Sequence, residues 1–252
     1  MVQKIGVVTP TFNHAHYLGE ALESVAWQTH LPGMIVVVDD ASEDNPYEVV
    51  QRFKGAVPTY FLSHEENRGP SAARNTGIEF LIGAGCDAIL PLDADDMMEP
   101  ELVEAMVDTI EQGAVEMAYP DVMYFGEQRG KYSCLPRSPE EMGKYIRHDN
   151  DMVNSSMYLS EVFEAVRAKN GTGYDPELHK PEHYGWEDWL FFLEAHLLGY
   201  LAKGIHRALF NYRITKDNGV RRANANAKQV WGYFCQKIER LYQVKLQVDR
   251  WH

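Results

Sequence analysis

The chain has 252 residues, of which 45% are hydrophobic and 24% are charged, and its formal net charge at pH 7 is −13. These values are ordinary for a soluble globular protein with a substantial core, and they exclude a small scaffold that depends on disulfides. The three cysteines, at positions 86, 134 and 235, are odd in number and scattered, so neither a disulfide framework nor a zinc motif is indicated. Neither a signal peptide nor an apolar run of membrane-spanning length is visible, so we expect a cytoplasmic protein.

The charge is distributed unevenly along the chain. Residues 201–252 contain eleven Lys or Arg and three Asp or Glu, so this segment carries +8 and the remaining residues carry −21. A basic segment after an acidic body can face substrate phosphates or an anionic membrane surface. A solvated helix face that pairs with the acidic body explains the pattern equally well. The negative total disfavours a broad nucleic-acid-binding surface.

Strands alternate with helices in the first part of the sequence. The run at 34–38 is β-branched and continuous, as expected for a parallel strand that is covered on both faces. Such alternation predicts βαβ units, right-handed crossovers and a parallel sheet. The predicted strands are 4–8, 34–38, 59–63 and 87–91, and the predicted helices are 17–26, 47–53 and 70–81.

Polar residues follow three of these strands. They are Thr9-Pro10-Thr11, Asp39-Asp40 and the cluster from Asp93 to Asp96. Ligands of open α/β sheets bind outside the carboxyl ends of the strands, where these residues would meet. The sequence therefore predicts a small-molecule site at this edge.

The segment 86–103 combines a short apolar strand, three carboxylates and the start of a helix at Pro100. Clustered carboxylates resist burial unless cations or strong donors lie nearby. A hard divalent ion shared with substrate phosphates is one such partner. An acidic loop that caps the next helix is the alternative, and the spacing alone does not decide between them.

The second part of the sequence is less regular. Glu187 and Asp188 fall in the first turn of a predicted helix, where they are either a general base with a supporting acid or simply favourable partners of the helix dipole. In chain order, we predict one or two strands in 115–125, a turn at 126–130, a variable loop at 131–150, a strand at 153–158, a helix at 160–169 capped by Ser160, a loop at 170–173, a helix from 186 that ends at Gly199, and an amphipathic helix at 224–244.

Four segments in series resemble glycosyltransferase family 2. They are VVTPTFNHAHYLGEALESVAWQT, VVVDDAS, NRGPSAARNTGIEFLIGAGCDAILPLDADD and GYDPELHKPEHYGWEDWLFFLEAHLLG, and the resemblance covers about residues 4 to 213. It implies an α/β GT-A fold with a Rossmann-like, mostly parallel sheet flanked by helices and a C-terminal acceptor-side subregion. We expect one domain over 1–252, with a nucleotide-sugar-binding half at 1–98, an acceptor and catalytic-base half at 99–223, and a C-terminal helix at 224–252.

The same resemblance implies an inverting transferase that moves a sugar from a nucleotide-sugar, usually a UDP-sugar, to an acceptor hydroxyl with Mn²⁺ or Mg²⁺ on the diphosphate. Asp188 is then the general base and Glu187 supports it. The implied donor contacts are Pro10, Thr11 and Asn13 in the nucleotide pocket, Asp40 on the uracil ring, Arg74 at the nucleotide or its phosphates, and Asp93 at the ribose or sugar. The implied metal ligands are Asp95, with Asp96 beside it, and Asp93, and His206 is a candidate third ligand.

A mobile basic segment with Arg213, Arg221 and Arg222 is a hypothesis for closure over the diphosphate, with Gly219 as a hinge; surface arginines are the alternative. A sugar nucleotidyltransferase, a phosphatase with an aspartyl nucleophile and a non-catalytic sugar-nucleotide-binding module are the rival functions. A phosphatase would carry its nucleophile, and a nucleotidyltransferase its phosphate-binding loop, after the first strand, where this chain has Thr9-Pro10-Thr11.

The acceptor is expected to be a surface glycan, its lipid-linked precursor or another hydroxyl compound. Peripheral membrane contact and an oligomer stay open.

Overall fold

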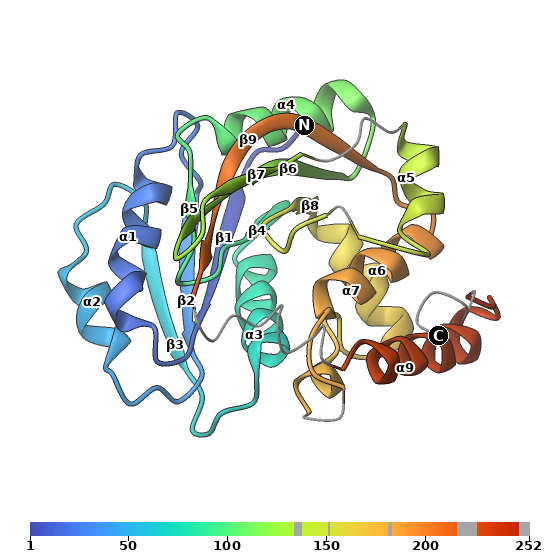
Figure 1. The fold of residues 1–252 in the computed structure, drawn as a ribbon. Coiled ribbons are helices and arrows are strands. Elements are labelled where there is room, and N and C mark those ends of the chain that lie inside the picture. Colours follow the sequence, from blue (N-terminus) through green and yellow to red (C-terminus); the bar gives the residue numbers. More distant parts are fainter. Residues whose placement is uncertain (134–137, 151, 181–182, 216–225, 247–252) are drawn as a thin grey trace.

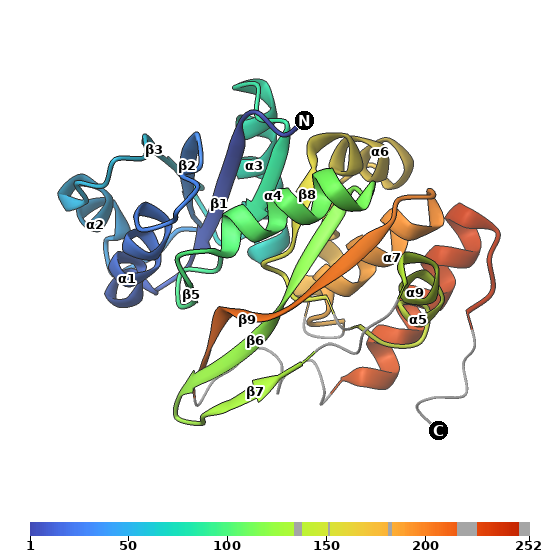
Figure 2. The same cartoon turned by 90° about the horizontal axis from the view of Figure 1, so that it is seen from above.

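The computed structural model describes residues 1–133, 138–150, 152–180, 183–215 and 226–246 (Figure 1). These described residues form one nine-stranded sheet in the order β3-β2-β1-β4-β8-β6-β9-β5, with β7 paired to β6. Helices cover both of its faces (Figures 1 and 2). The predicted α/β class is confirmed, and the mostly parallel sheet holds for the N-terminal half of the chain.

The N-terminal half is a parallel βαβ layer around β1. Strand β1 pairs in parallel with β2 on one side and β4 on the other, and β2 pairs in parallel with β3. The elements are β1 (Ile5–Thr11), α1 (Ala15–Ala26), β2 (Met34–Asp39), α2 (Pro46–Arg52), β3 (Thr59–Ser63), α3 (Pro70–Gly83) and β4 (Ala88–Pro91). All seven elements predicted here are confirmed, with small changes at their ends.

The β-branched strands divide the core between the two faces of the sheet. Val36 and Val38 of β2 pack with α3, whereas Ile35 and Val37 pack with α1 and α4. This alternation follows from the period of two along a strand. Because both faces are covered, β2 is buried except at its last residue, as the continuous apolar run predicts.

The C-terminal half extends the sheet with mixed pairing. Strand β8 pairs antiparallel with β4 and β6, while the long strands β6 and β9 are parallel to each other. The elements are β5 (Met97–Met98), α4 (Leu102–Gly113), β6 (Met117–Gly126), β7 (Gly130–Tyr132), α5 (Pro139–Tyr145), β8 (Met157–Leu159), α6 (Ser160–Asn170), the 3₁₀-helix η1 (Pro176–His179), α7 (Glu187–Leu197), β9 (Ala202–Ile214) and α9 (Ala227–Tyr242). One sheet thus runs through both predicted halves, and the boundaries at 98 and 223 stay a prediction.

Several predictions in this half are wrong in detail. The predicted loop at 131–150 contains a helix, because Ser138 and Glu141 form a reciprocal capping box that starts α5. Ser160 does not cap α6; its hydroxyl donates to the Cys86 carbonyl at 2.7 Å and fastens the helix to the connection between α3 and β4. The strand predicted at 153–158 is reduced to β8, and the short strand β5 lies between the acidic cluster and α4.

The C-terminal helix α9 packs onto the body of the protein. Val230, Trp231, Phe234 and Ile238 are fully or almost fully buried, which confirms the predicted amphipathic face. Trp231 lies 5.2 Å from Trp189 of α7, measured between ring centroids. Among the described residues, no helix has the length and apolar character needed to cross a membrane.

Candidate active site

The predicted convergence of strand ends is present. Thr11 at the end of β1 pairs in register with Asp39 at the end of β2. Leu92, which follows β4, donates its backbone N–H to Val8 of β1 at 2.9 Å. The polar residues after the three strands therefore share one edge of the sheet, and the site is built there.

Arg74 lies at the centre of this edge. Its guanidinium donates to Asp93 Oδ1 at 2.8 Å and to Glu187 Oε1 at 2.6 Å, and its side chain is only 4% exposed. Helix α3 can place Arg74 at this edge because it packs closely on the sheet. A Cβ added to Gly77 would be 2.4 Å from a methyl group of Val8. Arg74 therefore joins the acidic cluster after β4 to the acid pair of α7, which is 113 residues from it in sequence.

Asp188, the predicted general base, lies in the first turn of α7. Trp189 donates its backbone N–H to Asp188 Oδ1 at 2.8 Å and its indole N–H to the Ile146 carbonyl at 2.7 Å. Burial, followed by repulsion from Glu187, raises the pKa of Asp188 to about 7. A carboxylate whose pKa lies near neutral pH is suited to accept a proton from a hydroxyl.

The acidic loop after β4 is held by Arg213. Arg213 donates its backbone N–H to Asp96 Oδ1 at 2.8 Å and its Nε–H to the Asp95 carbonyl at 2.7 Å. Its guanidinium carbon lies 4.3 Å from the ring centroids of both Tyr17 and Phe125. These contacts fix Arg213 and contradict its predicted place in a mobile segment. Arg221, Arg222 and Gly219 lie outside the described residues.

Asp93, Asp95 and Asp96 differ in exposure. Asp96 is buried, whereas the side chains of Asp93 and Asp95 are 28% and 21% exposed. Burial and repulsion from Asp93 raise the pKa of Asp95, which means that its negative charge is incompletely compensated. His14 Nδ1 lies 3.9 Å from Asp95 Oδ1. Asp93 and Asp95 are thus the two acids of this loop whose side chains are partly exposed.

These two carboxylates fit an ion that takes one or two protein ligands and completes its shell with phosphate oxygens and water, as Mg²⁺ does. Within the described ranges, no three His, Cys, Asp or Glu side chains are grouped closely enough to hold a metal by themselves. The structure does not bring His206 to the loop. It is exposed on β9, seven residues before Arg213, which is about 23 Å of extended chain.

At the end of β1, Thr9 and Thr11 are buried, and their hydroxyls have no hydrogen-bond partner. Buried hydroxyls without partners cost free energy unless a ligand or water supplies one. Pro10 is buried between them. Asn13 accepts a hydrogen bond from Glu43 N–H at 2.8 Å and so links the loops after β1 and β2. The predicted nucleotide-pocket residues are therefore neighbours at this edge.

Asp40 has a structural role that the sequence did not reveal. Its Oδ1 lies 2.6 Å from His64 Nδ1 and accepts Arg68 N–H at 3.0 Å, and its Oδ2 accepts Gly69 N–H at 2.7 Å. The carboxylate thereby fixes the turn that leads into α3 and its Arg74. Contact between Asp40 and a nucleobase stays a prediction.

A family model described as "Glycosyl transferase family 2" matches residues 6–177. Two similar curated relatives are the glycosyltransferase GlyA of Streptococcus pneumoniae, 26% identical over 85% of this chain, and the putative teichuronic acid biosynthesis glycosyltransferase TuaG of Bacillus subtilis, 21% identical over 96% of it. The matched region is 31% of GlyA and 90% of TuaG. The chain thus spans about a third of the first relative and most of the second.

Solved structures share the fold. The S. aureus TarS fragment 1–349 in complex with UDP is 20% identical, with a TM-score of 0.69 over 95% of this chain and 66% of the fragment. The same fragment has also been solved with UDP-GlcNAc. The mannosyltransferase PcManGT from Pyrobaculum calidifontis, in complex with GDP-Man and Mn²⁺, is 17% identical, with a TM-score of 0.68 over 96% of this chain and 69% of that protein.

Proposed function

The chain belongs to glycosyl transferase family 2 and has the GT-A fold, and we propose that it transfers a sugar from a nucleotide-sugar, with a UDP-sugar favoured, to an acceptor hydroxyl with inversion. One observation carries the proposal: buried Arg74 bridges the strand-end acid Asp93 and the α7 acid Glu187. This bridge supports a single site that contains both the proposed base and the proposed donor-binding edge. An inverting transfer needs both groups, on opposite sides of the anomeric carbon.

The donor is proposed to lie across the ends of β1, β2 and β4. Thr11 and Pro10 line the nucleotide pocket, and the unpartnered hydroxyls of Thr9 and Thr11 support a polar ligand there. Asn13 and Asp40 form the pocket rim. A UDP-sugar is favoured because TarS binds UDP and UDP-GlcNAc, although the GDP-Man complex of PcManGT shows that the fold accepts another base.

Asp95 and Asp93 are proposed to hold Mn²⁺ or Mg²⁺ against the donor diphosphate. When bound, the ion supplies positive charge that stabilises the departing diphosphate. Arg74 contributes a second, permanent positive charge beside Asp93. The partly exposed side chains of Asp93 and Asp95 and the raised pKa of Asp95 support this assignment.

Asp188 is proposed to be the general base. Its pKa of about 7 keeps a large fraction ionised near neutral pH while leaving it basic enough to take the acceptor proton. Glu187 is tied to Arg74 at 2.6 Å, so it acts as the supporting acid that fixes the start of α7. A buried carboxylate with a raised pKa beside the Arg74–Glu187 contact fits a catalytic role, which favours an enzyme over a non-catalytic binding module.

The acceptor is proposed to be a surface glycan or its lipid-linked precursor at the cytoplasmic membrane face. The names of TuaG and of the minor teichoic acid biosynthesis protein GgaA of Bacillus subtilis, which is 27% identical over 88% of this chain, support this class. Membrane contact by the basic C-terminal segment and self-association are subsidiary parts of the same proposal.

The direct test is release of UDP from a panel of UDP-sugars in the presence of Mn²⁺, with a crude wall-glycan fraction as acceptor. We expect release with one UDP-sugar, transfer of its label to the glycan, and loss of at least about 90% of both signals with excess EDTA, because the ion neutralises the leaving group. GDP-mannose serves as the control for base preference. Turnover of GDP-mannose alone would contradict the UDP assignment, and full activity in EDTA would contradict the metal.

A further inference from the structure

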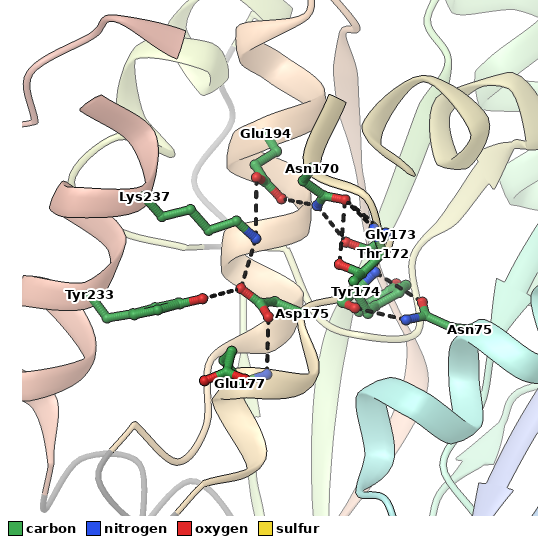
Figure 3. A network of polar contacts seen from close by, with 10 residues as sticks. All are labelled: Asn75, Asn170, Thr172, Gly173, Tyr174, Asp175, Glu177, Glu194, Tyr233 and Lys237. Atoms are coloured by element: carbon green, nitrogen blue, oxygen red, sulfur yellow. Dashed lines mark hydrogen bonds and ion pairs between the residues drawn. The ribbon is translucent and has the colours of Figure 1, made fainter. Parts of the chain in front are cut away.

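A buried polar cluster attaches α9 to the rest of the protein (Figure 3). Nζ of buried Lys237 lies 2.7 Å from Asp175 Oδ2 and 3.5 Å from Glu194 Oε1. The Tyr233 hydroxyl donates to the same Asp175 oxygen at 2.6 Å, and Asn170 donates to Glu194 Oε2 at 2.7 Å. Lys237 and Tyr233 lie outside residues 6–177, which the family model matches. The cluster thus connects a helix beyond the family match to Asn170 and Asp175, which lie within it.

The cluster contains one cation and two carboxylates, and the pKa values of the two carboxylates shift in opposite directions. Burial alone would raise the pKa of Asp175, but Lys237 and three donated hydrogen bonds lower it, so Asp175 is the ionised partner of Lys237. Burial raises the pKa of Glu194 to about 7 despite Lys237. The Lys237–Asp175 pair is therefore the strong link between α9 and the segment before η1.

Asp175 is adjacent to a residue that supports Arg74. Tyr174 exchanges two backbone hydrogen bonds with the Asn75 side chain, at 2.9 and 2.8 Å. Its ring stacks on Phe191 of α7, with centroids 4.4 Å apart and planes within 8°, and the Arg74 guanidinium carbon lies 5.7 Å from its centroid. The backbone around Asp175 thus sets the position of Tyr174, which contacts Asn75 of α3 and Phe191 of α7.

We propose that Lys237 is a positioning residue of the active site: by holding Asp175, it keeps Tyr174 under Arg74 and against α7, and so fixes the Arg74–Glu187 contact. This inference rests on the proposed function, because it takes Arg74, Glu187 and Asp188 as the site. The competing account is that the cluster only fastens α9 to the body. The two accounts differ in what they predict for the folded variant.

Two variants loosen the link without leaving an unpaired buried cation. Tyr233→Phe removes one hydroxyl from Asp175 and keeps the ring. The double variant Lys237→Met with Asp175→Asn removes the ionised pair together, so the formal charge is unchanged and no ionised partner is left buried alone. Lys228→Met on the exposed side of α9 is the matched control. Each protein is assayed well below its thermal midpoint, so that all molecules are folded.

We expect kcat for UDP release to fall about 3-fold in Tyr233→Phe and about 10-fold in the double variant, with KM for the UDP-sugar within about twofold, because small misplacement of reacting groups lowers kcat. Amide hydrogen exchange should accelerate in α3 peptides at 70–77 and not in the remote β2–α2 region. Unchanged kcat and unchanged exchange in α3, with a lowered midpoint, would overturn the proposal in favour of simple attachment.

Failure of the proposed function is distinguishable from failure of this inference. If the wild type turns over no nucleotide-sugar, the proposed function fails, and hydrogen exchange alone decides the coupling: acceleration in α3 supports it, and changes confined to α9 and 170–177 overturn it. If the wild type is active and the variants keep its kcat, the positioning role of Lys237 fails while the transferase assignment stands.

Discussion

Replacing Asp188 by Asn is expected to lower kcat for sugar transfer by about 10³-fold, which is within the usual contribution of a positioned general base. Asparagine has nearly the same shape and can still accept the Trp189 N–H that now lies 2.8 Å from Oδ1. It cannot accept the acceptor proton. Because the predicted donor contacts lie at other residues, the affinity for UDP should change by less than about twofold, and steady-state kinetics with UDP binding by calorimetry separate the two effects.

The pH dependence gives an independent check of the same group. The base acts when ionised, and the pKa of Asp188 is about 7, so kcat should rise between pH 6 and pH 8 with a midpoint near 7. Asp108→Asn, an equal chemical change on the exposed side of α4, should leave kcat and the profile as in the wild type. Full turnover by Asp188→Asn, or equal loss in Asp108→Asn, would remove Asp188 from its role.

Replacing Arg74 by Met is expected to lower the free energy of unfolding by about 3 kcal/mol and to remove measurable transfer. The Arg74 side chain is 4% exposed, and its removal leaves Asp93 and Glu187 without their shared cation. Urea denaturation of the purified variant measures the first effect, and UDP release measures the second.

Arg52→Met is the matched control, because Arg52 pairs with Glu48 on the surface of α2 with 78% of its side chain exposed. It should cost less than about 1 kcal/mol. Adding Glu187→Gln to Arg74→Met should recover part of the lost stability without recovering activity, since one unpaired buried charge is removed. A stable Arg74→Met protein that still transfers sugar would show that the bridge is unnecessary to the site.

The N-terminal half of the fold was predictable because its signals are local. The β-branched run of β2 predicts a strand and the Ala-rich start of α3 predicts a helix, each from its own residues alone. The alternation of such strands and helices along the chain then predicts the parallel topology. Helix α5 was missed although its capping box, Ser138 with Glu141, is readable from sequence. Strand β5 was missed because two residues carry no period, and its pairing with β9 is a tertiary contact.

The site was predictable residue by residue only through the family resemblance, and its connections were not. Nothing local indicates that Arg74 reaches Glu187 across 113 residues, or that Arg213 is fixed between Tyr17 and Phe125 rather than mobile. Asp40 is a similar case, since its three contacts with the turn before α3 depend on how that turn folds. These contacts are made only when the strand ends come together.

The measurement that tests the central claim most directly is the thermal midpoint of the purified protein with UDP and a panel of UDP-sugars, each with and without Mn²⁺. A ligand that binds the native state raises the midpoint by mass action, and no acceptor is needed. We predict an increase with UDP and one UDP-sugar that requires Mn²⁺ and is lost in Asp95→Ala but kept in Asp108→Ala. No increase with any nucleotide would contradict a donor site at the strand ends.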